Sequence, residues 1–282
     1  MIHDYYLSEA KSYKDLELAR KKKEILNKIK QDDKDDINGF YPKPEDLKNL
    51  PKDSVLLKIS FTLKKSYTSK DEGEFHIIDD KIFENPKIFE NPIVRDKFTG
   101  LPTIKPSTWK GHLRFASRRV DRDGKDEKEV IIKRLFGSES GEDEALRGRL
   151  YFFPTFFENE AVRDVITPLK RDTRTPTKRG PIPLEVMKPG NKGEFYLLYV
   201  PYPKGEDFKK EQIDDDLKFL AEALKLMFYT YGFSAKKTSG FGVIEWLSEN
   251  EVEVYPEPEN KKEIFSILYT KLNNNVKVGV KE

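Results

Sequence analysis

The chain has 282 residues, enough for one large domain or two small ones, and 37% of them are hydrophobic, so it is globular rather than disordered. Because cysteine is absent, disulfides and thiolate metal sites are excluded. The three histidines (His3, His76 and His112) are far apart in the sequence, so few residues are available for a histidine metal cluster or general base. Although 36% of the residues are charged, the net charge is only +2, so only local basic clusters could bind nucleic acid. No apolar run approaches the roughly 18 residues of a membrane span, and the N-terminus lacks a signal-peptide core; we expect a soluble, cytoplasmic protein with no membrane partner.

The first half of the chain predicts a charged helix, a linker, a strand and a second helix. Residues 14–31 are mostly charged with a thin apolar face, and residues 32–52 are polar and contain prolines, which is typical of a linker. Alternating apolar residues predict a strand over 54–63. After a repeated hexapeptide, KIFENP, at 81–92, a helix is expected near Pro106, with Ser107 as its N-cap and with Trp109, Leu113 and Phe115 in the core.

The second half predicts strands over 149–155, 194–200 and 242–247, a helix over 214–229 and a C-terminal helix around 261–271. The main elements then follow the order strand, helix, strand, strand, helix, strand. This order is that of the ferredoxin-like β-α-β-β-α-β fold, an α+β fold that RNA-binding domains often use. We expect an N-terminal helical extension and linker over 1–53, a core over 54–248 and a C-terminal helical extension over 249–282.

Three segments are candidates for binding a phosphate backbone. In GLPTIKPSTWKGHLR (100–114), three cations flank a helix N-terminus: Lys105, Lys110 and Arg114. GFSAKKTSGFG (232–242) combines glycines with two lysines, and KRDTRTPTKR (170–179) is a basic, hairpin-like insertion with five cations. The alternatives from the residues alone are an ordinary capped helix, a β-turn with an incidental lysine pair, and a solvated loop.

A loose acidic set surrounds the hexapeptide repeat. It comprises Asp79, Asp80, Glu84, Glu90 and Asp96. Paired carboxylates can bind Mg²⁺ or act as general bases, but spacing this loose is typical of surface charge.

The run FENPIVRD (89–96) followed by GLPTIKPSTWKGHLR resembles the signature of the RAMP superfamily, particularly the repeated backbone subunit of type III CRISPR effectors. RLFG (134–137), GRLYF (148–152) and TSGFGVIE (238–245) follow in the family's order, and the similarity covers about residues 54–247. The resemblance implies a ferredoxin-like (RRM-like) palm, a thumb hairpin from an insertion over about 160–192, and guide-RNA binding in an antiviral ribonucleoprotein. Its expected partners are guide RNA, target RNA and other CRISPR effector subunits.

The resemblance, together with the basic segments, assigns RNA contacts to three regions. The helix start would meet the RNA backbone, the glycine-rich loop would lie beside it, and the thumb would place an apolar wedge between bases. The residues are Lys105, Ser107, Thr108, Lys110, Arg114, Ile166, Lys170, Arg171, Arg174, Lys178, Arg179, Lys236, Lys237, Thr238, Ser239, Gly240 and Gly242. No cofactor is required for such binding.

Cleavage is a separate question. Cleaving members of the family carry an Asp where this chain has Glu90, and the additional methylene moves the carboxylate by an amount that can reduce a rate about 100-fold. The alternatives are therefore a metal-dependent endoribonuclease that uses Glu90 with Mg²⁺ or Mn²⁺, and a guide-precursor-processing RAMP nuclease that would have to use His76 or His112. A third alternative is a protein-only interaction module whose basic clusters are ordinary surface charge.

Overall fold

The computed structural model describes residues 37–70, 76–78, 87–89, 91–96, 99–122, 124–138, 146–170, 172–177, 180–204, 208–256 and 259–270. The helix predicted over 14–31 lies outside these residues.

A four-stranded antiparallel sheet forms the centre of the molecule. Its strand order is β10 (Val252–Tyr255), β1 (Val55–Thr62), β9 (Lys192–Tyr199) and β5 (Leu150–Phe152). β1 pairs with β9 along its whole length, because the alternating apolar residues of both strands turn to the same buried face. The α+β class expected from the sequence is therefore confirmed.

The strand predicted over 242–247 is wrong. Only Ile244 in this segment forms a bridge, to Leu63 at the end of β1, and the fourth strand of the sheet is β10, beyond the predicted core boundary at 248. Val243 and Glu245 hydrogen-bond with Lys64 and Thr62 on either side of this bridge. Beyond them, Trp246 stacks on Tyr229 with 4.3 Å between ring centroids and donates its indole N–H to the carbonyl of Tyr269. The alternating pattern of the segment thus reflects packing on a helix.

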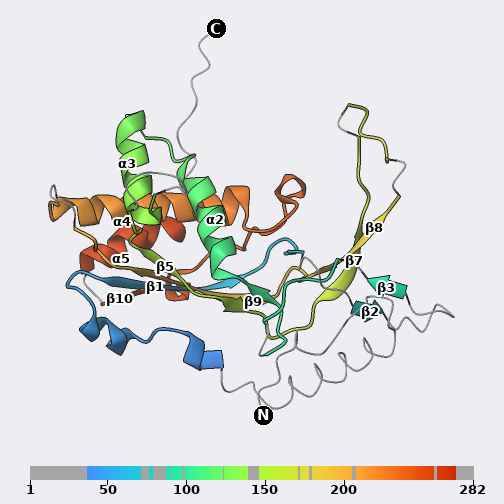
Figure 1. Ribbon diagram of the computed structural model, residues 1–282, viewed down its shortest axis with the longest axis horizontal. Helices are drawn as coiled ribbons and strands as arrows, with labels where there is room; N and C mark the ends of the chain where they lie inside the picture. Colours follow the sequence, from blue (N-terminus) through green and yellow to red (C-terminus); the bar gives the residue numbers. More distant parts are fainter. Residues whose placement is uncertain are drawn as a thin grey trace, which may run out of the picture.

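Helices cover one face of the sheet (Figure 1). They are α2 (Pro106–Ser117), α3 (Lys125–Phe136), α4 (Glu211–Leu226) and α5 (Glu259–Phe265). α4 begins three residues before the predicted helix and continues into a π turn, Met227–Tyr231, while α5 begins two residues before the predicted C-terminal helix. The apolar sides of α2 and α4 and the inner face of β1 form one continuous core.

Trp109 is the central side chain of this core. It is fully buried, donates its indole N–H to the hydroxyl of Thr155 at 3.1 Å, and packs edge-on against Phe61 and Phe195. The predicted core role of Phe115 is wrong, because that ring is only half-buried and lies at the helix surface. The predicted N-cap is also wrong: Lys105 is the N-cap residue, and Pro106, whose missing N–H is tolerated in the first turn, precedes Ser107 in the helix.

The opposite face of the sheet is partly covered by residues predicted to be linker. Two 3₁₀ turns, Ile37–Phe40 and Pro44–Asn49, lie below the sheet in Figure 1. Between them, Tyr41 stacks on Tyr196 of β9 with ring centroids 4.2 Å apart and planes 17° from parallel. This part of the predicted linker is therefore packed structure.

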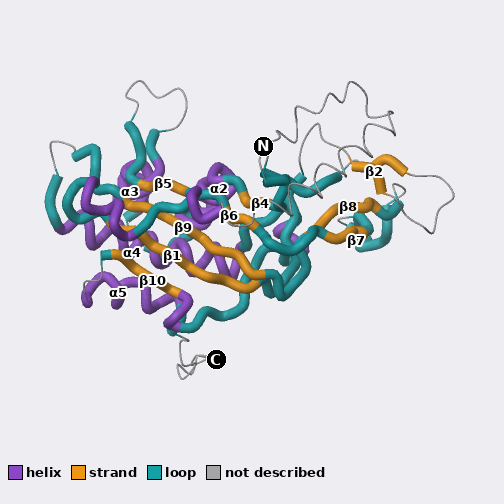
Figure 2. The backbone as a smooth tube through the Cα atoms, turned by 90° about the horizontal axis from the view of Figure 1, so that it is seen from below, coloured by secondary structure: helices purple, strands orange, loops and turns teal. Residues whose placement is uncertain are grey.

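A hairpin projects from one end of the main sheet. β7 (Val162–Ile166) pairs antiparallel with β8 (Ile182–Val186), and Figure 2 shows the pair beyond the ends of β1 and β9. Its base is fixed by Glu185, whose carboxylate accepts from Arg95 at 2.7 Å and from the backbone N–H of Ile93 at 3.0 Å. Short pairs of strands, β2 (His76–Ile78) with β3 (Lys87–Phe89) and β4 (Thr103–Ile104) with β6 (Thr155–Phe156), complete the described strands.

Candidate nucleic-acid interface

Helix α2 and the glycine-rich loop meet at the surface. The ammonium of Lys237 lies 3.7 Å from the ring centroid of Phe115, so residues far apart in the sequence are in direct contact. The same lysine acts on His112: burial, and then the positive charge of Lys237, lower the pKa of this imidazole to about 4. Two of the predicted basic segments therefore form one surface.

The start of α2 adds further positive charge. Lys105, Ser107 and Lys110 are exposed, whereas Thr108 and Arg114 are half-buried. Partial burial and the neighbouring charge of Arg114 both lower the pKa of Lys110, as expected for cations that share one region. The helix N-terminus contributes partial positive charge at the same place.

The glycine-rich loop owes its shape to residues with positive φ. Lys236 (φ 63°), Gly240 (φ 76°) and Gly242 (φ 77°) surround a 3₁₀ turn, Lys237–Ser239. Lys236, Thr238, Ser239 and Gly240 are exposed at its tip. Gly242 is buried, donates its N–H to the carbonyl of Ser66, and leaves no room for a Cβ, which would lie 2.6 Å from Ser234. Gly242 thus shapes the loop and has no N–H left for a ligand.

The loop also contacts the base of the hairpin. Phe241 and Ile166 both pack against the buried pair Leu184 and Val186. Ile166, the predicted wedge, is therefore half-buried, and the hairpin instead exposes Val165 and Leu169, each with 51% of its surface accessible.

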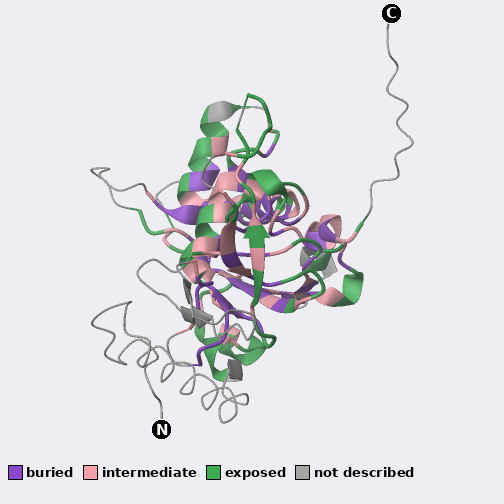
Figure 3. Ribbon diagram, turned by 90° about the vertical axis from the view of Figure 1, so that its right-hand side faces the viewer, coloured by how far each residue is buried: buried purple, intermediate pink, exposed green. Residues whose placement is uncertain are grey.

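The basic tip of the hairpin extends away from this contact. Lys170 and Arg174 are exposed, and the N–H of Arg174 donates to the carbonyl of Lys170 across the turn. Arg171, Lys178 and Arg179 lie outside the described residues. Figures 1 and 3 show α2 and the mostly exposed hairpin rising on the same side of the main sheet. We call the start of α2, the 236–242 loop and the hairpin tip the basic track.

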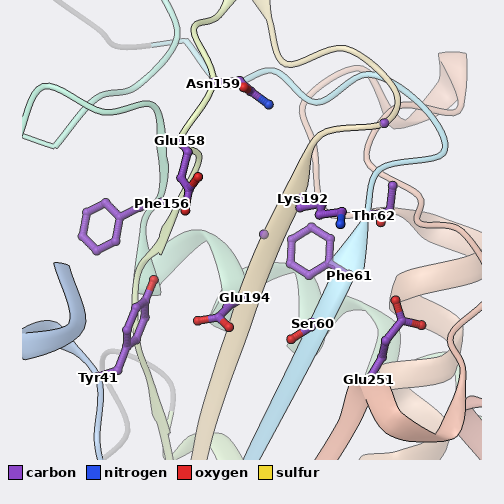
Figure 4. Close-up of a pocket in the computed structure, with 12 residues that line it drawn as sticks. Tyr41, Ser60, Phe61, Thr62, Phe156, Glu158, Asn159, Lys192, Glu194 and Glu251 are labelled. Carbon is purple, nitrogen blue, oxygen red and sulfur yellow. The ribbon is translucent and has the colours of Figure 1, made fainter. Parts of the chain in front are cut away.

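A hollow of about 650 Å³ lies at the other face of the sheet (Figure 4). Tyr41 and Phe156 border it, and Ser60, Thr62, Lys192 and Glu194 reach it from β1 and β9. Its charged side chains are the carboxylates Glu158, Glu194 and Glu251, with Lys192 as their cationic neighbour. On this face Lys58 of β1 also pairs with Glu194 at 3.3 Å, so carboxylates and ammonium groups are mixed there.

The structure describes only two of the candidate catalytic side chains, Asp96 and His112. Asp96 stabilises a turn, accepting from the N–H and the hydroxyl of Thr99 at 2.8 and 3.0 Å. Asp79, Asp80, Glu84 and Glu90 lie outside the described residues, as does the side chain of His76. A pKa of about 4 makes His112 a poor general base at neutral pH. Within the ranges that the structure describes, no three His, Asp or Glu side chains gather to hold a metal ion.

Sequence reasoning missed three residues beside the basic track. Arg119 places its guanidinium carbon 3.6 Å from the ring centroid of Phe115, and Tyr231 of the π turn meets the same ring edge-on, with centroids 5.4 Å apart. The helical spacing of Phe115 and Arg119, four residues, was the available signal for their contact. Nothing in the sequence connects either residue with Tyr231.

The antiparallel sheet with helices on one face and a projecting hairpin defines a chain of the α+β class. A family model for the RAMP superfamily matches residues 85–245, more than half of the chain, which therefore belongs to the RAMP superfamily. The resemblance inferred from the motifs is thereby confirmed at family level. No curated protein matches the chain. No helix among the described residues is long and apolar enough to cross a bilayer.

The solved structures with similar chains include two CRISPR complexes. One is a chain of the type III-B Cmr-beta complex bound to cognate target RNA, with 17% identity over 89% of this chain and 80% of that chain, at a TM-score of 0.49. The other belongs to a type IV-B CRISPR complex, with 11% identity over 72% of this chain and 95% of that chain, at a TM-score of 0.41.

Proposed function

We propose that this chain is a subunit of a CRISPR effector complex and binds the guide RNA along the basic track. The observation that carries the proposal is the contact between Lys237 and Phe115, which joins the glycine-rich loop to the last turn of α2, the helix whose first turns carry Lys105 and Lys110. Membership of the RAMP superfamily supports it, as does the effector context of the two similar chains. Type III is the class that the motif pattern favours.

The track suits a sugar-phosphate backbone. Lys110, Lys236 and Lys237 are point charges that neutralise phosphates, and the first turn of the 12-residue α2 offers partial positive charge and, at Ser107, an exposed hydroxyl. The hairpin would extend this surface with Lys170 and Arg174. Contacts of this kind are independent of base order, as binding of diverse guides requires.

We further propose that the palm is ferredoxin-like. Taken in chain order, the four core strands are β1, β5, β9 and β10, and their spatial order 4-1-3-2 is that of this fold. RRM domains stack RNA bases on the open sheet face. Here the ring of Tyr41 stacks on Tyr196 on that face and covers it, and carboxylates line the adjacent hollow. The RNA path therefore follows the helix and hairpin side.

The test is binding of single-stranded RNA by the full chain, measured by fluorescence anisotropy across a salt series. Contacts with four to seven phosphates predict a log K versus log salt slope of about −3 to −5, because each releases roughly 0.7 counterion. The affinity should differ little between unrelated sequences. Co-expression with the neighbouring effector proteins of its own genome tests the assembly: the chain should co-purify with them and with guide RNA. Failure to do so would refute the subunit role while leaving RNA binding intact.

A further inference from the structure

Two cations, Arg119 and Lys237, lie against the ring of Phe115 on α2. The guanidinium carbon of Arg119 lies 3.6 Å from the ring centroid of Phe115, and the ammonium of Lys237 lies 3.7 Å from it. Each distance is well inside the roughly 6 Å range of a cation–π contact. Two groups this close to one centroid leave no face of Phe115 open to a stacking nucleobase.

Neighbouring groups restrict Arg119 further. Arg119 donates from Nη1 to the carbonyl of Phe115 at 3.0 Å, and its guanidinium lies 5.6 Å from the ring centroid of Tyr231. Tyr231 ends the π turn Met227–Tyr231 and meets Phe115 edge-on, at an interplanar angle of 85°. π turns of this kind occur frequently at functional sites. Three separate elements, α2 with the turn after it, the π turn and the glycine-rich loop, thus build one cluster.

The described residues give the cluster no anion of its own. Among the described residues, no carboxylate lies within ion-pairing distance of Arg119 or Lys237. Burial, and then the charge of Arg119, lower the pKa of Lys237, so the two like charges act on each other without a compensating acid. An anion bound beside each of them would relieve this repulsion.

The geometry points to a subsite for two neighbouring phosphodiesters of the RNA strand, one beside Arg119 and one beside Lys237, held in shape by Phe115 and Tyr231. This inference rests on the proposed RNA binding and deepens it. The guanidinium supplies planar, forked N–H donors and the ammonium a compact charge, a combination suited to phosphate oxygens. Phe115 is a positioning residue: it touches both cations and no phosphate, and it reduces the rotamer freedom that each cation would lose on binding.

Substitution of the ring tests the subsite in the full chain. Phe115→Leu keeps both charges and most of the apolar volume but removes the ring face, whereas Phe115→Tyr keeps the ring. The matched control is Phe208→Leu, because Phe208 also lies near a lysine and an arginine, Lys204 at 4.7 Å and Arg149 at 5.6 Å, outside the basic track. RNA affinity, its salt dependence and the thermal midpoint are measured for all four proteins.

We expect Phe115→Leu to weaken RNA binding about fivefold at physiological salt and to reduce the magnitude of the salt slope by about 0.7 to 1.4, the loss of one or two ionic contacts. Phe115→Tyr should restore both quantities, and Phe208→Leu should leave both unchanged. Wild-type affinity and slope in Phe115→Leu would overturn the subsite while the proposed function stands, and so would an equal loss in Phe208→Leu. A wild-type chain that binds no RNA would instead refute the proposed function, and the subsite with it.

Discussion

Arg149 and Asp216 form a buried ion pair, with 2.9 Å between the guanidinium Nη1 and the carboxylate Oδ2. Arg134 donates from Nε to the other oxygen of Asp216 at 2.7 Å, and the hydroxyl of Tyr199 donates to Oδ2 at 2.8 Å. Arg134 and Arg149 belong to two of the motifs that carry the family resemblance. These motif residues therefore hold α3, β5, β9 and α4 together rather than binding RNA.

Asp216→Asn should destabilise the protein by about 3–5 kcal/mol, because it leaves Arg149 buried without its counter-charge, whereas Arg134 keeps Asp215 within 3.7 Å. Urea unfolding followed by circular dichroism measures this change. Asp214→Asn is the matched control, since Asp214 lies exposed in the first turn of the same helix, and its effect should stay within about 0.5 kcal/mol. Similar stabilities of the two variants would show that the ion pair is not structural.

The stability of the protein should fall as the pH drops from about 6.5 to about 4 because of His112. Its pKa is about 4 in the folded chain and about 6.5 when unfolded, so in this window the unfolded state binds a proton that the folded state does not. His112→Asn should lose this part of the pH dependence, seen as a shallower fall in the urea midpoint between these pH values. Equal pH profiles of variant and wild type would contradict the burial of a neutral imidazole.

Glu90 should not support efficient RNA cleavage. Wild type and Glu90→Ala, incubated with guide RNA, complementary RNA and Mg²⁺ or Mn²⁺, should give equally low amounts of cut product on a denaturing gel. The physical reason is the additional methylene of Glu, which displaces the carboxylate relative to the Asp of cleaving relatives. Metal-dependent cutting by the wild type that Glu90→Ala abolishes would establish the endoribonuclease alternative.

The fold was predictable where the spacing of apolar residues in the sequence matched the side of the helix or strand that is buried. The alternation of Leu57, Ile59 and Phe61 identified β1, because one face of that strand meets the core. β10 was missed because it has only four residues, VEVY, between Glu251 and Pro256. Residues 242–247, in contrast, showed a strand-like pattern that serves contacts with Tyr229 and Tyr269. Local pattern does not show which partner a short segment meets.

The candidate site was predictable in its parts and not in its assembly. The basic segments could be found from composition, and helix α2 and Lys237 of the glycine-rich loop proved to be in contact. The cluster of Phe115, Arg119 and Tyr231 depends on a π turn. The structural role of Gly242 depends on its close approach to Ser234. A linear sequence pattern shows neither feature. Trp109 was correctly expected in the core because its spacing follows the buried side of α2.

The central claim is that the basic track binds RNA, and the most direct test compares two charge reversals in one salt series. Lys110→Glu lies on the track, whereas Lys48→Glu makes the same change at an exposed lysine of the 3₁₀ turn on the opposite side of the sheet. We predict a wild-type affinity that falls steeply with salt, a loss of about tenfold for Lys110→Glu with its thermal midpoint unchanged, and wild-type binding for Lys48→Glu. Absence of wild-type binding at about 50 mM salt, or equal losses in both variants, would contradict the account.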